Sequence, residues 1–453
     1  MFKSVNRIHF VGIGGIGMSG IAEILLQQGF SVSGSDMSES DNVRELRSKG
    51  AKVFIGHNAE NIHNAEVVVY SSAVNPYTNP ETVRASDLGI PIIRRAEMLA
   101  EVSRLNYCVA VAGTHGKTTT TSMIALIAIN AGIDPTVIVG GRLRDFGGTN
   151  ARLGKGEWTI VEADEYDRSF LQLQPTIAII NNIEAEHLDI YTDIEDIRKT
   201  FTEFANKVPF YGLVVIGSDD VGVQKISDDL KRKSVTFGIG EDSYYRATNI
   251  VESQSGARFN LICNEKIICD IHLKVPGIHN IKNALAAISV AHKMGIDFQI
   301  IKQSLEAFNG VYRRFDVRGE FGGVLVIDDY AHHPTEVKAT LNAAKSYGRR
   351  IVVAFQPHTF TRTQAMYREF AESFDDADVV IITEIYPARE QAIEGVTGKL
   401  IANRLIESGK SNVHFIKTLD EVRASIFDIV KPGDVFLTIG AGNICDLVDC
   451  FDV

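Results

Sequence analysis

The chain has 453 residues, of which 45% are hydrophobic and 23% charged, and its formal net charge is −11. This length exceeds what one hydrophobic core organises, so we expect two or three domains. The acidic net charge argues against nonspecific nucleic-acid binding. The five cysteines are scattered and form no CxxC pair, which indicates a reducing compartment. They predict neither a zinc site nor a disulfide framework.

The first predicted elements are a strand at Arg7–Gly12 and a helix over Met18–Gln28. Glycines interrupt the N-terminal apolar stretch and Glu23 follows it, so we do not expect this stretch to be a signal peptide. No apolar run in the sequence reaches membrane-spanning length. The sequence therefore predicts a cytoplasmic protein without a membrane partner.

The turn after the first strand carries four glycines in a G-x-G-x-x-G pattern, namely Gly12, Gly14, Gly15 and Gly17. Such a turn lets the backbone approach a diphosphate at the N-terminus of the following helix. Asp36 follows where a dinucleotide site places the acid that binds a ribose. The pattern fits NAD and a UDP-type ligand equally, and a purely structural tight turn is the alternative.

Strands and helices continue to alternate, which is typical of parallel α/β architecture. In this first segment the further strands are predicted at Ser31–Gly34, Val53–Ile55, Val67–Tyr70 and Ile90–Ile93, and a further helix around Ala96–Val102.

A second glycine motif follows the predicted strand Tyr107–Ala112 and opens a helix that runs to Ala131. Its residues are Gly113, Thr114, His115, Gly116, Lys117, Thr118 and Thr119. The motif resembles a phosphate loop, although Val111 stands where the standard pattern has its first glycine. Its backbone N–H groups are expected to hold the phosphates of a nucleoside triphosphate, with Lys117 on the β- and γ-phosphates and the Thr118 hydroxyl on Mg²⁺.

Acidic groups follow the next two predicted strands. Glu162 begins the motif EADE after the strand Trp158–Val161, and a solvated group of charges is the alternative to a Mg²⁺ ligand there. His187 belongs to NNIEAEHLD, which follows the strand Thr176–Ile180. Acids and a histidine at a strand end favour a second metal or a transferred phosphate, whereas a lone histidine is usually structural.

The rest of the second segment is predicted as a helix at Ile194–Lys207, a strand at Gly212–Ile216, an antiparallel β-rich insertion over Val235–Leu273 and a helix at Ile281–Met294. The polar residues His279, Asn280 and Asn283 lie at the start of that last helix. Asn280 is equally an N-cap or an amide that pairs with an adenine edge.

The third segment starts near Val311, and its strands are predicted at Val324–Ile327, Arg350–Ala354, Val379–Ile382, His414–Ile416 and Val435–Ile439. Polar groups follow two of these strands, with Asp329, Tyr330 and His332 after the first and His358 and Arg362 after the second. Since sites form at the carboxyl ends of parallel strands, we expect these groups to share one site. The pair Arg313-Arg314 precedes them.

These motifs together resemble the Mur ligases of peptidoglycan synthesis, and within that family the alanine-adding branch. The resemblance covers essentially the whole chain in order. It is carried by GIGGIGMSGIAE from Gly12, AGTHGKTTTT from Ala112, EADE, NNIEAEHLD, PGIHNIKNALAA from Pro276, RRFDVRGE from Arg313, DDYAHHPTE from Asp328, FQPHTFTR from Phe355 and GAGNI from Gly440.

The resemblance implies an α/β protein of three domains, each on a largely parallel sheet. They are a Rossmann-like UDP-substrate domain (1–104), a central phosphate-loop ATPase domain with a β-rich insertion (105–311) and a Rossmann-like domain that binds the amino acid and closes (312–453). It also implies small-molecule substrates, no nucleic-acid partner, and a monomer or weak homodimer.

The resemblance further implies roles for individual residues. The UDP-sugar would be held by Gly12, Gly14, Gly15, Gly17, Asp36, Ser71, Ser72, Ala73 and His115. ATP would be held by Gly113 to Thr119, His279, Asn280, Asn283, Arg314 and Asp329. Metal would be bound by Thr118, Glu162 and His187, and L-alanine by Tyr330, His332, His358 and Arg362. Lys117, His332 and Arg314 would be catalytic.

The implied reaction uses ATP and Mg²⁺, with Mn²⁺ as a substitute, to add L-alanine to UDP-N-acetylmuramate through an acyl phosphate. Two departures concern binding: Thr359 stands where the family often has Arg, and Tyr166 and Arg168 replace smaller residues of the family pattern. The alternatives are a muropeptide-recycling ligase that adds a tripeptide to the same sugar, an NAD-binding oxidoreductase and a non-catalytic nucleotide-binding scaffold.

Overall fold

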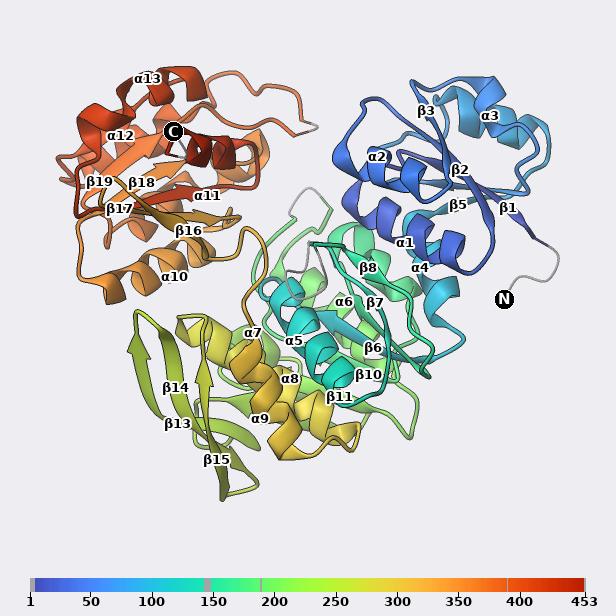
Figure 1. The fold of residues 1–453 in the computed structure, drawn as a ribbon, viewed down its shortest axis with the longest axis horizontal. Helices are drawn as coiled ribbons and strands as arrows, with labels where there is room; N and C mark the ends of the chain where they lie inside the picture. Colours follow the sequence, from blue (N-terminus) through green and yellow to red (C-terminus); the bar gives the residue numbers. More distant parts are fainter. Residues whose placement is uncertain (1–4, 142–147, 188–189, 389, 452–453) are drawn as a thin grey trace. The chain divides into compact units, whose positions relative to one another are not determined.

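The computed structural model describes residues 5–141, 148–187, 190–388 and 390–451, and its helices and strands alternate along the chain (Figure 1). The chain forms two compact units. The first comprises Met1–Thr248, Asn260–Ile271 and Lys282–Phe308, and the second Asn249–Phe259, His272–Ile281 and Asn309–Val453. Three sheets are built from the described strands, which confirms the predicted α/β class with three sheets.

The first sheet has the strand order β3-β2-β1-β4-β5, and all its pairs are parallel. Its elements are β1 (Arg7–Val11), α1 (Ile16–Gln27), β2 (Ser31–Asp36), α2 (Asp41–Ser48), β3 (Lys52–Ile55), β4 (Val67–Tyr70), α3 (Pro80–Asp87), β5 (Ile92–Arg94) and α4 (Arg95–Ser103). The chain order reverses beside the central β1, so the loops after β1 and β4 diverge there and form the crevice where ligands bind in such sheets.

The second sheet has the order β15-β14-β13-β12-β11-β10-β6-β9-β7-β8. Its strands are β6 (Tyr107–Ala112), β7 (Thr136–Ile138), β8 (Ala151–Arg152), β9 (Trp158–Glu162), β10 (Ile177–Ile180), β11 (Leu213–Gly217), β12 (Ser234–Gly238), β13 (Tyr245–Ser253), β14 (Gly256–Cys263) and β15 (Lys266–Leu273). Its helices are α5 (Lys117–Asn130), α6 (Ile194–Asn206), α7 (Val221–Gln224), α8 (Ile278–Lys293) and α9 (Phe298–Ala307).

One expectation for this sheet was wrong for its first strand. The stretch Val235–Leu273 was predicted to be antiparallel, but β12 pairs in parallel with β11 and with β13. The half-exposed start of β12 gives it the polar–apolar alternation of an antiparallel strand. The two-residue connections between β13, β14 and β15 do make hairpins, and Asn264 and Glu265 in the second one both have positive φ, as a tight hairpin turn requires.

The third sheet lies in the second unit and has the order β16-β17-β21-β18-β19-β20. Its elements are β16 (Asp316–Phe321), β17 (Val324–Asp329), α10 (Pro334–Ala344), β18 (Ile351–Phe355), α11 (Phe360–Ser373), β19 (Val379–Ile382), α12 (Lys399–Glu407), β20 (Val413–Phe415), α13 (Leu419–Ile429) and β21 (Val435–Ile439). Only β16, among the described strands of this sheet, runs antiparallel to its neighbour. Alternate residues of the central strands pack into two separate cores, one on each face of the sheet.

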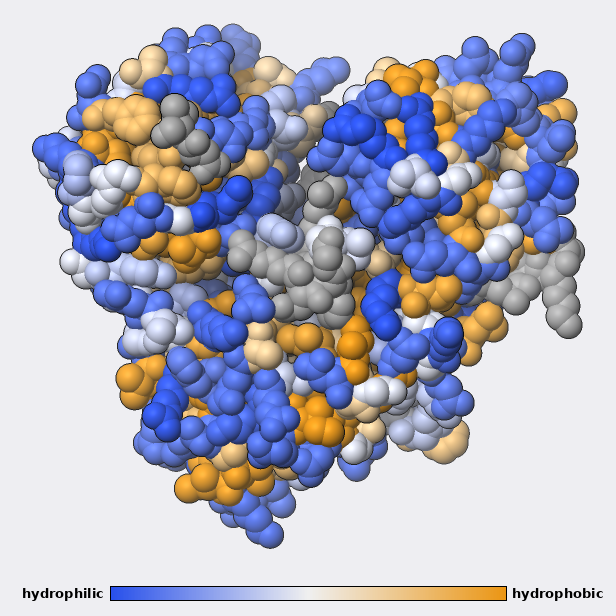
Figure 2. Space-filling model, in the orientation of Figure 1, coloured by the Kyte–Doolittle hydropathy of each residue, from blue (hydrophilic) through white to orange (hydrophobic). Residues whose placement is uncertain are grey.

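The face of the molecule seen in Figure 2 is mostly hydrophilic, with hydrophobic residues in small groups. Among the helices of the described residues, none combines the length and the apolar character that crossing a membrane requires.

Candidate active site

The loop between β6 and α5 has the shape of a phosphate-binding loop. Gly113 and Gly116 have φ values of 134° and 79°, a region that side chains other than glycine rarely adopt. A Cβ atom on Gly116 would lie 2.4 Å from the Oδ1 atom of Asn283 on α8, so space and backbone conformation both require glycine. The Asn283 Oδ1 atom also accepts a hydrogen bond from the Thr120 hydroxyl (3.2 Å).

Two asparagines after the neighbouring strand β10 hold this loop. The Asn182 Oδ1 atom accepts a hydrogen bond from the backbone N–H of His115 at 2.7 Å, and its backbone oxygen accepts one from the N–H of Thr114 at 3.1 Å. The Nδ2 group of Asn181 donates to the backbone oxygen of His115 (3.3 Å) and to the Thr120 hydroxyl (3.2 Å). Because β6 and β10 are adjacent and parallel, these loops meet at one edge of the sheet.

Lys117 begins α5, and a carboxylate holds its ammonium group. Its Nζ atom donates to both oxygens of Glu165 at 2.9 and 2.8 Å and to the backbone oxygen of Gly113 at 2.7 Å. Burial lowers the pKa of Lys117, but the charges of Glu165, Asp164 and Glu186 outweigh it, so the pKa lies above its usual value and the amine stays charged. Burial raises the pKa of Glu165 to about 7, although the Lys117 charge opposes this.

A group of oxygen and nitrogen donors lies beside Lys117. One ligand atom from each of Glu165, Glu186 and His187 lies within 4.8 Å of the others. Glu162 ends the strand β9, which pairs with β6 at Val111, so Glu162 lies at the same sheet edge. Carboxylate oxygens are what Mg²⁺ prefers in proteins, and the donor set therefore fits a divalent cation. Of the motif that supplied His187, Leu188 and Asp189 lie outside the described residues.

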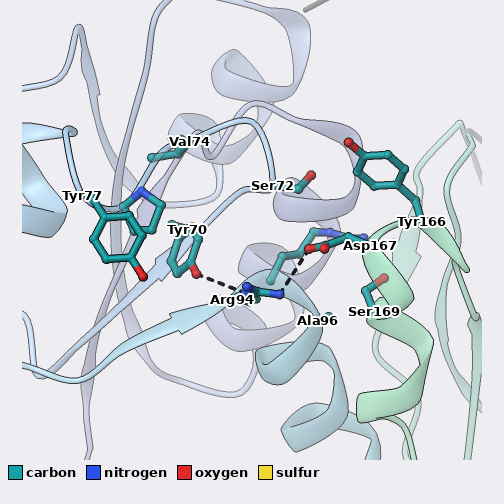
Figure 3. A pocket seen from close by; sticks show the side chains of 11 residues that line it. Tyr70, Ser72, Val74, Tyr77, Arg94, Ala96, Tyr166, Asp167 and Ser169 are labelled. Atoms are coloured by element: carbon teal, nitrogen blue, oxygen red, sulfur yellow. Dashed lines mark hydrogen bonds and ion pairs between the residues drawn. The ribbon is translucent and has the colours of Figure 1, made fainter. Parts of the chain in front are cut away.

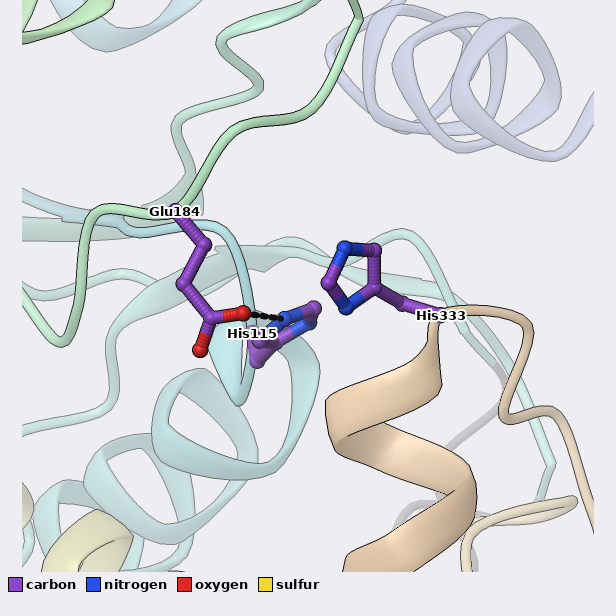
Figure 4. A group of neighbouring side chains, drawn as sticks. All are labelled: His115, Glu184 and His333. Carbon is purple, nitrogen blue, oxygen red and sulfur yellow. Dashed lines mark ion pairs between the residues drawn. The ribbon is translucent and has the colours of Figure 1, made fainter. Parts of the chain in front are cut away.

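The His115 ring, which belongs to the same loop, has a different carboxylate partner. Its Nε2 atom pairs with the carboxylate of Glu184 at 3.5 Å (Figure 4). Glu184 is placed by its own backbone N–H, which donates to the Thr114 hydroxyl at 2.9 Å. Both side chains come from loops at the carboxyl edge of the second sheet.

The glycine turn, Asp36 and Ser71–Ala73 come together at the carboxyl edge of the first sheet. The Asp36 Oδ2 atom accepts a hydrogen bond from the Gly14 N–H at 2.8 Å, so this carboxylate braces the turn. A Cβ atom on Gly12 would lie 3.1 Å from the Cβ atom of Ser71, which shows how closely the two loops approach. This is the crevice beside β1 and β4 that the strand order indicates.

A cavity of about 240 Å³ opens beside this crevice (Figure 3). One wall comes from the first sheet and α4, and the other from the segment that follows Glu165 in the motif EADE. Its lining includes Tyr70, Ser72, Tyr77, Arg94, Arg95 and Tyr166. The cavity thus joins a loop predicted to bind the UDP-sugar to the segment that directly follows Glu165, the carboxylate that holds Lys117.

In the second unit, the residues predicted to bind the amino acid form one cluster. The rings of His332 and His358 have centroids 5.7 Å apart, and the Tyr330 ring lies edge-on to His332 at 5.4 Å. Arg362 donates to the Nδ1 atom of His358 at 3.1 Å. The ring of Tyr386 stacks on His358 at 5.8 Å, which adds an aromatic wall that sequence analysis did not predict.

The bonds of His332 define its tautomer. Its Nδ1 atom lies 3.0 Å from the backbone oxygen of Tyr330, which only accepts, so Nδ1 carries the proton. The Glu336 carboxylate accepts from the His332 backbone N–H at 3.0 Å and lies 3.4 Å from the same ring nitrogen. In the neutral ring the Nε2 atom then holds the lone pair.

Asp329 and the two arginines lie at the same sheet edge. Asp329 accepts from the backbone N–H groups of Phe315 (2.8 Å) and Ala331 (2.7 Å), and burial raises its pKa to about 6 although the Arg314 charge opposes this. Arg314 pairs with Glu336 at 3.6 Å and lies over the Tyr330 ring. Arg313 instead binds the carboxylate of Asp328 and the backbone oxygen of Gly440 (2.7 Å).

The residues at the start of α8 have different surroundings. The Nδ2 group of Asn280 donates to the backbone oxygen of Pro276 at 2.7 Å, while Asn283 reaches the phosphate loop as described. Burial and the nearby Arg314 charge lower the pKa of His279 to about 4, although Glu336 opposes this, so the ring is neutral.

Replacing His279 with glutamine is expected to reduce the acid sensitivity of the fold. The native ring binds fewer protons than the unfolded one between pH 4 and 6.5, so its contribution to stability is present at neutral pH and is lost as pH falls through that window. The variant should lose about 1–2 kcal/mol of this pH dependence. Urea unfolding at pH 7 and pH 4.5 measures it; an unchanged pH dependence would contradict the assignment.

Several residues of these clusters were not singled out from the sequence, namely Glu165, Glu186, Asn182, Arg95, Glu336 and Tyr386. Some signal was present for Glu165, Glu186, Asn182 and Glu336, because they belong to the motifs EADE, NNIEAEHLD and DDYAHHPTE at strand ends. Arg95 and Tyr386 lie in segments without a motif, so only the structure associates them with the other residues.

Comparison with known proteins agrees with this geometry. Models described as the Mur ligase family catalytic domain, the Mur ligase middle domain and the Mur ligase glutamate ligase domain match residues 7–107, 111–291 and 313–442. A UDP-N-acetylmuramate–L-alanine ligase of Sulfurihydrogenibium sp. is 50% identical over 99% of this chain and 98% of its own length. One of Geotalea uraniireducens is 49% identical over 98% and 97%.

Solved structures give the same result. A UDP-N-acetylmuramate–alanine ligase of Thermotoga maritima has a TM-score of 0.84 and 33% identity, covering 98% of both chains. A murein peptide ligase of Psychrobacter arcticus has a TM-score of 0.75 and 25% identity, again over 98% of both. The sequence, the three sheets and the relatives that match over almost the whole chain show that the chain belongs to the Mur ligase family.

Proposed function

We propose that this chain adds L-alanine to the lactyl carboxylate of UDP-N-acetylmuramate, using ATP and releasing ADP and phosphate. The observation that carries the ATP-driven chemistry is Lys117, held by Glu165 at the start of α5 beside Glu186 and His187. The choice of amino acid follows the relatives at about 50% identity, which are named as L-alanine ligases, while the murein peptide ligase is 25% identical.

The reaction has two steps, because a carboxylate has no good leaving group. The lactyl carboxylate attacks the γ-phosphorus of ATP, which forms an acyl phosphate and releases ADP. Lys117 stabilises the negative charge on the phosphoryl oxygens, and the N-terminus of α5, which the loop from Gly113 to Gly116 presents, orients them. The amine of L-alanine then attacks the acyl carbon, and phosphate leaves.

A divalent cation fits the donors beside Lys117. The Thr118 hydroxyl, Glu162 and His187 are our proposed ligands, and Glu165 and Glu186 extend the set. When bound, Mg²⁺ supplies charge neutralisation to the phosphoryl group. Because Glu165 also holds Lys117, this carboxylate orders both the ammonium group and the donor cluster.

The amine must lose a proton before it attacks, and His332 is our candidate to accept it. Its Nδ1–H bond to the backbone of Tyr330 leaves the Nε2 atom as the base. The guanidinium of Arg362, beside His358, is our candidate for the carboxylate of L-alanine, and Arg314 and Asp329 for ATP.

Replacing His332 with alanine is expected to lower kcat for L-alanine about 10- to 100-fold, because proton transfer is then left to water. Hydroxylamine traps an acyl phosphate without help from a base, so hydroxamate formation should stay close to that of the unmodified chain. The exposed His414 on β20 provides the control variant, His414→Ala, with unchanged kcat. Equal loss of both reactions in His332→Ala would contradict the role as a base.

The proposed function is tested by phosphate release from ATP with Mg²⁺ and UDP-N-acetylmuramate, with each amino acid and the tripeptide supplied singly. Release that needs both the UDP-sugar and L-alanine supports the proposal. Release with the tripeptide alone would assign the chain to muropeptide recycling. No release in any combination, together with NADH binding, would favour an oxidoreductase.

The remaining proposals concern organisation. We assign 1–104 to the UDP-substrate domain, 105–311 to the ATP domain and 312–453 to the amino-acid domain. We further propose that the chain acts in the cytoplasm on small-molecule substrates, as a monomer or weak homodimer, and that Mn²⁺ replaces Mg²⁺ in the reaction.

A further inference from the structure

The second sheet ends at β15, and none of the described strands pairs with the outer side of this strand. An edge strand directs a row of backbone N–H and C=O groups outward, so it can pair with a strand of another chain. Natural edge strands are often very short or carry proline, which prevents such pairing. By contrast, β15 has 8 residues and no proline, and its Ile267 is 71% exposed. The edge formed by β15 is therefore a candidate surface for strand pairing.

The hairpin turn before β15 determines which of its residues direct their backbone groups toward the edge. The turn has two residues, both with positive φ, and Lys266 follows it as the first residue of the strand. In such a hairpin the two residues that flank the turn form a hydrogen-bonded pair, and every second residue along each strand continues this bonding. The alternate residues direct their N–H and C=O groups to the edge, and these are Ile267, Cys269 and Ile271.

This alternation restricts how two copies of β15 can pair with each other. In an antiparallel pair about a two-fold axis, the edge-directed residues of one copy must lie opposite the edge-directed residues of the other. The axis must then pass through a residue and not between two residues. Near the middle of the strand, the residues through which the axis can pass are Ile267, Ile268, Cys269 and Asp270.

The charges of β15 select one of these registers. With the axis at Ile268, Lys266 of one copy lies directly opposite Asp270 of the other, and the symmetry makes this pair twice. With the axis at Asp270, two carboxylates would face each other. The remaining two registers place Lys266 opposite His272 or opposite an isoleucine. Opposite charges that face each other across two strands stabilise the pairing, whereas like charges destabilise it, so the axis at Ile268 is favoured.

Asp270 is ordered within its own chain and is still accessible. Its Oδ1 atom accepts a hydrogen bond from the Nζ group of Lys302 on α9 at 3.0 Å, while 43% of the Asp270 side chain is exposed. Lys302 also lies 3.7 Å from a carboxylate oxygen of Glu306, so two carboxylates share its charge. A carboxylate offers about four lone-pair sites, so Asp270 can accept Lys266 of another copy while it keeps Lys302.

We propose that two copies of this chain pair through β15, antiparallel about a two-fold axis at Ile268. The second sheets of the two copies then continue into each other. Ile268 packs on Ile268 of the second copy on one face, and Ile267 packs on Cys269 of the second copy on the other. Because the contact is small, the dimer is weak, with a Kd on the order of 100 μM. The proposal names the surface of the weak homodimer proposed above and does not depend on the reaction that the chain catalyses.

Sedimentation velocity of the full chain over a concentration series tests the charge pairing. Lys266→Glu and Asp270→Lys each place like charges opposite each other and are expected to weaken self-association about 10-fold or more. An equimolar mixture of the two variants restores both pairs of opposite charge, so it should associate about as strongly as the unmodified chain. This recovery would also show that both variants are folded. Lys199→Glu, on the exposed face of α6, is the control and should self-associate as the unmodified chain does.

Cysteine cross-linking tests the register without changing a charge. Ile268→Cys places two thiols at the two-fold axis with a Cα separation of about 4.5 Å, which a disulfide spans, so oxidation with diamide should join the two copies. Ile406→Cys, 55% exposed on α12, is the matched control and should cross-link no more than the unmodified chain. The inference is overturned if Ile268→Cys cross-links no more than Ile406→Cys. It is also overturned if the mixed charge variants associate no better than either alone, or if the unmodified chain stays monomeric throughout.

Discussion

Replacing Lys117 with methionine should lower kcat for L-alanine-dependent phosphate release about 1000-fold or more. Lys117 is the side chain at the start of α5 that carries a full positive charge beside the phosphate loop, and its pKa is raised by Glu165. A positioned donor of this kind is worth about 100- to 1000-fold in rate, and the lost charge adds to that. The measurement is phosphate release at saturating ATP, UDP-sugar and L-alanine.

This variant needs a control for folding, because it leaves a buried carboxylate without its cation. Glu165 is 2% exposed, and breaking such a pair costs about 3–5 kcal/mol of stability. The double variant Lys117→Met/Glu165→Gln removes the stranded charge and should recover most of that stability while kcat stays low. Lys199→Met, on the exposed face of α6, should leave both quantities unchanged. A double variant with normal kcat would contradict the role of Lys117.

Strands buried on both faces were predicted best from the sequence. The predicted limits of β19 (Val379–Ile382) and β21 (Val435–Ile439) agree with the structure, because such strands are continuous apolar runs bounded by polar residues. The edge strand β16 was not predicted. Its sequence alternates charged and apolar residues and was interpreted only as a site motif. Exposure on one side removes the apolar run by which a strand is recognised.

The candidate site was also predicted only in part from the sequence. Motifs at strand ends identified Lys117, His187 and His332, because the carboxyl ends of parallel strands are where loops carry chemistry. Their partners come from elsewhere in the fold: Lys117 is held by Glu165, and Gly17 is covered by Arg95. A local pattern contains no information on which distant side chain arrives at a given atom, so these contacts required the structure.

The contacts also connect the two proposed substrate sites through one short segment. Glu165 holds Lys117, while Tyr166 and Asp167 next to it line the cavity beside the first sheet. The Tyr191 hydroxyl donates to the backbone oxygen of Glu165 at 2.6 Å, which anchors the start of the segment. In the proposed reaction the carboxylate to be phosphorylated must lie near both proposed sites, and this segment contributes residues to each of them.

Replacing Glu81 with alanine is expected to destabilise the first sheet and its helices by about 3–5 kcal/mol. Glu81 lies on α3 with no exposed surface, and its carboxylate accepts hydrogen bonds from the Ser35 hydroxyl (2.5 Å) and the Nδ2 group of Asn61 (2.6 Å). The His9 Nε2 atom lies 3.5 Å away. Burial raises the pKa of Glu81, but the hydrogen bonds from His9, Ser35 and Asn61 outweigh this effect. The pKa therefore lies below its usual value, and the charged form is favoured.

Urea unfolding, followed through the first transition because the chain has several domains, measures this effect. Glu81→Gln keeps one oxygen that accepts from Asn61 but puts an amide donor in place of the oxygen that accepts from Ser35, so its cost should be smaller than that of alanine, about 1–2 kcal/mol. Glu39→Ala removes an exposed glutamate from the same part of the chain and should change stability by less than about 0.5 kcal/mol. Since Ser35 lies next to Asp36, the braced glycine turn depends on this network, and Glu81→Ala should also weaken UDP binding. Equal stability of Glu81→Ala and Glu39→Ala would show that the buried carboxylate contributes nothing to the fold.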